Sequence, residues 1–165
     1  MDALIAAAAR ALATGDILGA LNRVALRDDG PALALRGIAM AQLGDLARAK
    51  ALLKSAAQAF GPKEAVARAR CIVAEAEIAF VSRELSWPVA TLAAARTTLE
   101  QRGDPINAIH ALHLEVRRML LLGQLDDAEH RLGAPPSTPL PPALIAAHHM
   151  IAAGIAMRRL QAAPA

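Results

Sequence analysis

The sequence is poor in aromatic residues and in cysteine. Its 165 residues include one Trp, two Phe, no Tyr and one Cys. β-Sandwiches and β-barrels depend on aromatic and β-branched side chains in alternation, so this shortage argues against an all-β fold. The lone Cys71 excludes an intramolecular disulfide and a disulfide-stapled scaffold. A reducing compartment is therefore expected.

The sequence also lacks a strong excess of charge and a long uninterrupted apolar run. It has 18 basic and 15 acidic residues, a net charge of +3, and its arginines are scattered rather than clustered. Nucleic-acid binding normally requires a basic stripe on one face, so we expect no direct sequence-specific nucleic-acid binding by this segment. The apolar run at 3–9 has no basic residues before it, and the uncharged stretch at 132–157 contains five prolines. We expect no signal peptide, no membrane contact and a cytoplasmic location.

Alanine and leucine are abundant, with 42 and 24 residues. Both are strong helix formers because they lose little side-chain freedom in a helix, so the sequence predicts an all-α fold. Residues 133–142 hold five prolines and are expected to form a linker before the last helix, within a single domain over 1–165. Glycines, prolines and the capping residues Asp16, Asp45, Ser86 and Asp104 predict about nine helices, which short connections make antiparallel. Their expected ranges are 2–13, 17–27, 31–43, 46–60, 63–83, 87–102, 105–122, 124–132 and 142–160.

A six-residue pattern recurs along the chain. GDLARA at 44–49 returns as GQLDDA at 123–128, as GDILGA at 15–20 and, more loosely, as LSWPVA at 85–90. In each copy a helix stop and a cap precede a large apolar residue, and a small residue follows three positions later. This pattern predicts a tight helical hairpin in which alanine lets two helices approach closely. The structural residues of this repeat are Gly44, Asp45, Leu46, Ala49, Trp87, Ala90, Gly123, Leu125 and Ala128.

The stretch 30–63 resembles a tetratricopeptide repeat over the full 34 residues. Gly37 matches the small position of the first helix and Met40 the large position one turn later, and the turn follows at 44–46. Ala49, Leu53 and Ala56 would form the buried stripe of the second helix, while Leu33 replaces the family's aromatic residue. The resemblance implies tetratricopeptide-like hairpins stacked as a right-handed superhelical array. The alternative is a plain antiparallel helical bundle.

The last predicted helix repeats part of this unit. Residues 154–157 with Leu160 match 37–40 with Leu43, so the last helix looks like the first helix of a further repeat. Either this helix caps the array or the chain is a piece of a longer protein. We expect the second alternative. Its apolar face, Leu144, Ile151 and Ile155, has no repeat partner in the chain, so a homodimer through the last helix is a further possibility.

The sequence has no recognisable catalytic motif. Cys71 lies among apolar residues without a histidine one turn away, which favours a buried, unreactive thiol. His110 and His113 share a helix face, but no zinc-binding spacing accompanies them. We therefore expect no catalytic residue, no metal and no cofactor.

The family resemblance suggests where a partner would bind. First helices of tetratricopeptide arrays line a concave groove, and the mixed, mildly basic lining would suit a carboxylate or an acidic peptide. The alternative is that these side chains belong to ordinary solvated helix faces. When the groove-facing positions of the family's first helices are matched to this sequence, the groove candidates are Glu75, Arg83, His110, His113, Arg117, His148 and Arg158.

The sequence therefore predicts a non-catalytic protein-interaction or regulatory module. Its Ala- and Arg-rich repeats look like the helical-repeat part of bacterial transcriptional regulators, in which a separate domain binds DNA. Two alternatives stay open. One is a stand-alone adaptor for assembly or secretion partners, and the other is a small helical ligand-binding domain.

Overall fold

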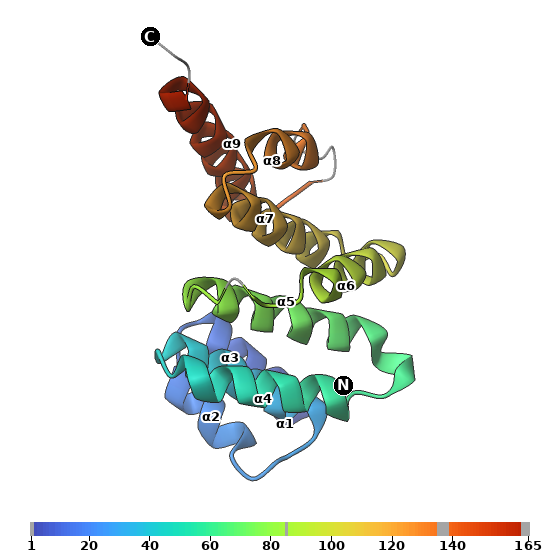
Figure 1. Cartoon of the computed structure of the whole chain (residues 1–165). Helices are drawn as coiled ribbons and strands as arrows, with labels where there is room; N and C mark the ends of the chain where they lie inside the picture. Colours follow the sequence, from blue (N-terminus) through green and yellow to red (C-terminus); the bar gives the residue numbers. More distant parts are fainter. Residues whose placement is uncertain (1, 85, 135–138, 163–165) are drawn as a thin grey trace. The chain divides into compact units, whose positions relative to one another are not determined.

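A computed structural model describes residues 2–84, 86–134 and 139–162, and within these ranges the structure is helical, without a strand (Figure 1). The expected all-α fold is confirmed. The elements in the described ranges are α1 (Ala3–Ala13), α2 (Ile17–Val24), α3 (Gly30–Gln42), α4 (Leu46–Ala59), the 3-10 turn η1 (Pro62–Glu64), α5 (Ala65–Val81), α6 (Val89–Gln101), α7 (Pro105–Leu121), α8 (Leu125–Leu132) and α9 (Pro142–Ala162).

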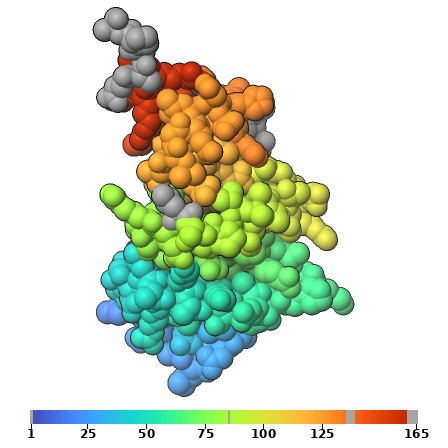
Figure 2. Space-filling view, in the orientation of Figure 1, coloured from blue at the N-terminus to red at the C-terminus, as the bar shows by residue number. Residues whose placement is uncertain are grey.

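The chain divides into two compact units, Met1–Trp87 and Pro88–Ala165, which we call unit 1 and unit 2. In unit 1, α1 packs on α2, α2 on α3, α3 on α4 and α4 on α5. In unit 2, α6 packs on α7, and α7, α8 and α9 pack on one another. The space-filling view shows the side chains of α4 and α5 adjoining on one face of unit 1 (Figure 2).

Asp16, Asp45 and Asp104 cap helices as predicted, and Asp2, which was expected inside the first helix, caps it as well. The carboxylates of Asp2, Asp16, Asp45 and Asp104 accept backbone N–H groups from the first turn of α1, α2, α4 and α7 at 2.9, 2.9, 3.1 and 3.3 Å. These bonds satisfy donors that have no partner inside the helix. A fifth cap, Asp29, holds the Ala32 N–H of α3 at 3.1 Å.

The predicted cap at Ser86 is wrong. Helix α6 begins at Val89, and Pro88 precedes it with extended backbone, φ −66° and ψ 103°. A proline disfavours helical backbone in the residue before it, so Trp87 stays outside the helix instead of filling its first turn. Ala90 is consequently exposed and is no buried spacer. The buried residues of α6 are Leu92, Ala95 and Leu99.

The turns after α3 and α7 share one geometry. Gly44 and Gly123 have φ of +85° and +74°, and the following N–H groups reach back to the carbonyls of Met40 and Met119, both at 3.0 Å. This Schellman motif needs left-handed backbone, which glycine adopts without a Cβ penalty. Arg83 occupies the same position after α5 with φ +57°. An arginine therefore stands where the motif favours glycine.

Replacing Arg83 with glycine is expected to raise the free energy of unfolding by about 1 kcal/mol, because left-handed backbone costs a non-glycine residue about 1–2 kcal/mol. Urea denaturation followed by circular dichroism at 222 nm measures the change. Ser82→Gly is the matched control, since Ser82 has φ −75° and gains nothing from glycine. A variant Arg83→Gly no more stable than the wild type would contradict the prediction.

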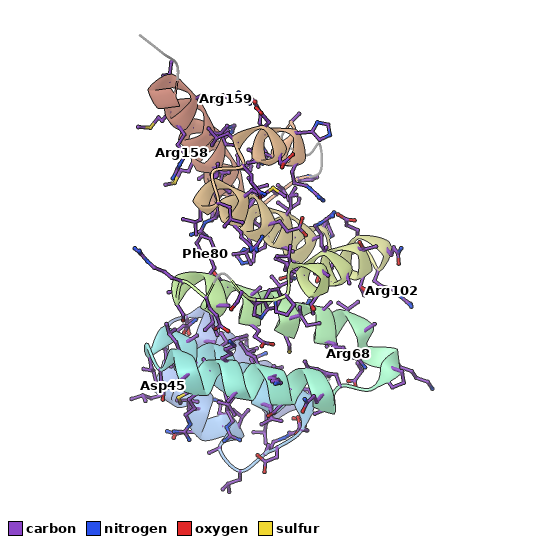
Figure 3. The ribbon with its side chains drawn as sticks, viewed as in Figure 1. Asp45, Arg68, Phe80, Arg102, Arg158 and Arg159 are labelled. Carbon is purple, nitrogen blue, oxygen red and sulfur yellow. The ribbon has the colours of Figure 1, made fainter. Side chains whose placement is uncertain are left out.

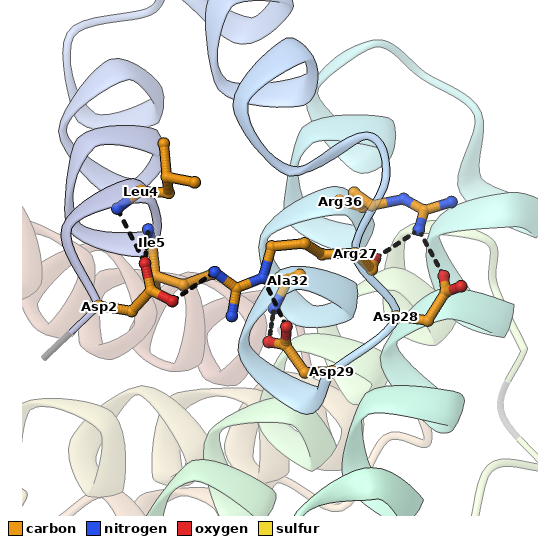
Figure 4. A network of polar contacts seen from close by, with 8 residues as sticks. All are labelled: Asp2, Leu4, Ile5, Arg27, Asp28, Asp29, Ala32 and Arg36. Carbon is orange, nitrogen blue, oxygen red and sulfur yellow. Dashed lines mark hydrogen bonds and ion pairs between the residues drawn. The ribbon is translucent and has the colours of Figure 1, made fainter.

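Helix α2 ends at Val24 and not at residue 27 as predicted, because Arg27 folds back on the loop. Its guanidinium donates to the carboxylate of Asp2, and to that of Asp29 at 2.6 Å (Figure 4). These hydrogen bonds lower the pKa of both aspartates. Since Asp2 and Asp29 cap α1 and α3, one arginine links the starts of two helices. The neighbouring Arg36 adds bonds of 3.0 Å to the Arg27 carbonyl and to the carboxylate of Asp28.

Two other boundaries differ from prediction. The helix expected from residue 63 is preceded by η1, in which the Glu64 carboxylate accepts the Gly61 N–H at 3.0 Å, and α5 spans Ala65–Val81. In the Pro-rich segment, residues 133, 134 and 139–141 are non-helical, while 135–138 lie outside the described residues. None of the helices in the described ranges has the length and apolarity needed to cross a membrane.

The core of unit 1 is built on alanine. The predicted stripe of α4 is confirmed, since Ala49, Leu53 and Ala56 are its buried residues. They face Gly37 of α3, whose missing side chain leaves room for Leu53. Small side chains of this kind bring the helices of unit 1 close together. The alanines of unit 1 that are no more than 1% exposed are Ala8, Ala20, Ala32, Ala39, Ala49, Ala56 and Ala79.

Candidate functional site

Unit 1 contains an apolar groove between α3, α4 and α5, with a volume of about 330 Å³. Helix α3 supplies one wall, α5 the other, and α4 contributes residues between them. Seven of the nine lining residues are aliphatic, and Gln42 and Glu77 are the polar ones. The lining consists of Ile38, Ala41, Gln42, Leu46, Leu53, Ala74, Glu77, Ile78 and Val81.

The floor of this apolar groove is buried and its walls are exposed. Leu53 and Ile78 are 1% and 5% exposed, whereas Ile38 and Val81 on the two walls are 37% and 60% exposed. Apolar surface left in water costs roughly 25 cal/mol per Å², so covering both walls at once would be favourable. The groove therefore offers a docking position for an apolar group.

The charge near the apolar groove is acidic or balanced. Glu77 is its charged lining residue, and just after Val81 the carboxylate of Glu84 pairs with the ammonium group of Lys50 at 2.5 Å. The family resemblance led us to expect a mildly basic lining instead.

The predicted site residues of unit 1 do not line the apolar groove. Glu75 is half-buried on α5 and borders a separate polar hollow of about 420 Å³, together with Lys54 of α4 and Arg68 of α5 (Figure 3). Arg83 is exposed in the turn after α5. The sequence analysis thus placed these two residues on α5 and its end but missed the walls formed by Ile38 and Val81.

In unit 2 the predictions for His113 and His148 need correction. Both were expected in an open groove, but they are 4% and 2% exposed and face each other, with 3.4 Å between Nε2 of His113 and Nδ1 of His148. Burial, with smaller effects from His148, His110 and Arg117, lowers the pKa of His113 to about 4. Burial, with His149, also lowers the pKa of His148. Both imidazoles are therefore neutral near pH 7.

The remaining candidates of unit 2 lie at or near the surface. His110 is half-buried and Arg117 exposed, both on α7. Arg158 is exposed on α9, and its guanidinium donates to the Gly154 carbonyl one turn earlier at 3.1 Å (Figure 3). His110 and Arg117 are near enough to His113 to contribute to its lowered pKa.

The expectation that the last helix presents Ile151 and Ile155 on an uncovered face is wrong. Both are buried in a core cluster with Val116, Ala128 and Leu132. Helices α7 and α8 pack on α9, so these two residues are covered within unit 2. A homodimer through the last helix stays a prediction.

The structure gives the state of the single thiol and the spacing of side chains that could bind a metal ion. Cys71 is buried, and desolvation followed by the charge of Glu75 raises the pKa of its thiol to about 11, which disfavours the nucleophilic thiolate. No three His, Cys, Asp or Glu side chains of the described ranges are close enough to hold a metal ion. The chain matches no family model, no curated protein and no solved structure.

Proposed function

We propose that the chain is a non-catalytic protein-binding module whose apolar groove in unit 1 receives an amphipathic helix of a partner protein. The observation that supports this most directly is the pair of exposed walls, Ile38 and Val81, above the buried floor of Leu53 and Ile78. A closed core would cover all four residues. Here two are left for another chain to cover.

The size and shape of the apolar groove favour a side chain over a whole small molecule. Its volume of about 330 Å³ is near the lower end of the roughly 300–1,000 Å³ typical of ligand pockets. One or two aliphatic side chains projecting from a helix at spacings of three or four residues suit such a groove.

The setting we propose is a bacterial transcriptional regulator whose DNA-binding domain lies outside this chain. The tetratricopeptide-like stretch 30–63, which contributes α3 and α4 to the groove, supports this setting. In such a protein unit 1 would sense or recruit a partner. An adaptor for assembly or secretion partners would use the same groove, so the binding test below does not depend on that choice.

The binding prediction is tested by selecting peptides from a displayed library of random amphipathic helices against the full chain. We expect the selected peptides to carry aliphatic residues at helical spacing, which match the aliphatic lining of the groove. Ile38→Gln and Val81→Gln should each weaken their binding about tenfold or more, measured by fluorescence anisotropy, because each removes a wall.

Leu26→Gln is the matched control, since Leu26 is 100% exposed in the loop after α2 and does not line the apolar groove. Its peptide affinities should equal those of the wild type. The proposal is contradicted if no helix-forming peptide is enriched, or if the selected peptides bind Ile38→Gln and Val81→Gln as tightly as the wild type.

A further inference from the structure

The buried histidine pair of unit 2 connects three elements. His113 belongs to α7 and His148 to α9, with 3.4 Å between their facing ring nitrogens and 5.5 Å between ring centroids. The backbone of Gly133, the residue directly after α8, also acts on His148 and favours its protonated form. One imidazole pair therefore lies where α7, the end of α8 and α9 meet.

The neutral pair can form one N–H···N bond across the two facing ring nitrogens, in which one ring donates and the other accepts. When both rings are protonated, two N–H donors lie face to face and this bond between α7 and α9 is lost. A single added proton already places a positive charge on rings that are 4% and 2% exposed, where an uncompensated charge is costly.

Among the described residues, the charged and titratable groups that lower the pKa of the pair are histidines and an arginine. On α7 the groups that act on His113 are His110 and Arg117, and on α9 His149 acts on His148. From α8 the Gly133 backbone reaches the pair, while Arg131 is directed to Glu115 at 3.6 Å. Protonation therefore adds a cation to a buried place that already has cationic or neutral neighbours.

The pair also lies next to the core of unit 2. Val116 and Ile151 each follow a histidine of the pair by three residues, on the same helix faces, and both are buried in the cluster that holds α9 against α7 and α8. Movement of α9 away from His113 would open this cluster. Loss of the imidazole contact and loss of the apolar contact are thus coupled.

We propose that His113 and His148 form an acid-sensitive latch, which holds α9 on α7 and α8 when both rings are neutral and loosens this packing when protonation buries a positive charge on the pair. The latch is independent of the groove in unit 1 and of the function proposed for it. It provides unit 2 with a reversible response to acidification.

The direction and size of the response follow from linkage. A histidine whose pKa is lowered by folding contributes stability above its unfolded pKa of about 6.5, and this contribution is lost as the pH falls toward the folded value. With a folded pKa of about 4 for His113, the opening equilibrium should shift about 30-fold toward the open form between pH 8 and pH 5. The lowered pKa of His148 acts in the same direction.

Amide hydrogen exchange on the full chain tests the latch. After correction for intrinsic exchange, protection at residues 151–155 of α9 should fall about 30-fold or more between pH 8 and pH 5, while α4 in unit 1 changes less than threefold. In His113→Gln/His148→Gln the change at 151–155 should shrink to that of α4. His130→Gln, at an exposed histidine of α8, is the control and should respond as the wild type does.

A second measurement keeps the test decisive if the double variant does not fold. Titration of the imidazole carbon-bound protons by NMR in the wild-type chain should show two histidines protonating below pH 6. Five histidines that all titrate near pH 6.5, or protection of α9 that is equal at pH 5 and pH 8, would overturn the latch.

Discussion

Replacing Gly37 with leucine is expected to lower the free energy of unfolding by about 3 kcal/mol. A Cβ atom at this position would lie 2.8 Å from Cγ of Leu53 and 3.2 Å from the carbonyl oxygen of Ala49. Leu53 is 1% exposed, so it can yield only by disturbing the core between α3 and α4. Overpacking of this kind costs about 1–3 kcal/mol, and leucine adds three further carbons in the same direction. Urea denaturation followed by circular dichroism measures the loss.

Gly154→Ala is the matched control in another helix. There a Cβ atom meets the flexible end of Arg158 at 3.3 Å, so the free energy of unfolding should stay equal or rise by up to about 1 kcal/mol through better helix propensity. A double-mutant cycle with Gly37→Ala and Leu53→Ala locates the cause. The cost of Gly37→Ala should disappear when Leu53 is already alanine. A Gly37→Leu variant as stable as the wild type would refute the close approach of α3 and α4.

The second large effect is expected from Arg96→Met in unit 2, with a loss of about 3 kcal/mol. Glu115 of α7 is 3% exposed, and its carboxylate accepts a bond from Nε of Arg96 on α6 at 3.1 Å. Arg131 of α8 is farther away, at 3.6 Å. Removing Arg96 would leave a buried carboxylate poorly compensated, and breaking a buried ion pair in this way typically costs about 3–5 kcal/mol. Thermal and urea denaturation of the variant measure the loss.

Two further variants separate charge burial from packing. Arg96→Met/Glu115→Leu removes both charges and should recover most of the lost stability, because an apolar pair of similar volume has no desolvation cost. Glu100→Gln removes the exposed second partner of Arg96 and should change the free energy of unfolding by less than about 0.5 kcal/mol. If Arg96→Met lowered the free energy of unfolding no more than Glu100→Gln does, the buried carboxylate of Glu115 would not need Arg96 as its partner.

Local features of the fold could be predicted from the sequence because their causes are local. Asp16, Asp45 and Asp104 cap the helices they precede, since the bond joins a side chain to a backbone group three residues away. Where a distant residue intervenes, prediction was less accurate. Helix α2 was expected to reach residue 27, but Arg27 is drawn to the N-terminal Asp2, 25 residues earlier in the chain.

The candidate site was less predictable because it depends on which helices cover which faces. A histidine on a helix can line a groove or lie in a core, and packing of α7 against α9 decides this for His113 and His148. The apolar groove was missed for the opposite reason. Ile38 and Val81 look like core residues by type, and their exposure follows from the spacing of α3 and α5 around α4.

The hairpin of α3 and α4 contains two glycines, Gly37 and Gly44, that are required for different physical reasons. Around Gly44 no atom lies within 4 Å of an added Cβ, so backbone dihedral angles alone restrict this position. Asparagine, which tolerates left-handed backbone, is the natural replacement there. Gly37 has ordinary helical backbone but no volume to spare, so its replacements are limited by size. In related chains we therefore expect Gly or Asn at position 44. At position 37 we expect Gly or one of the smallest side chains. The first position is restricted by backbone conformation and the second by volume.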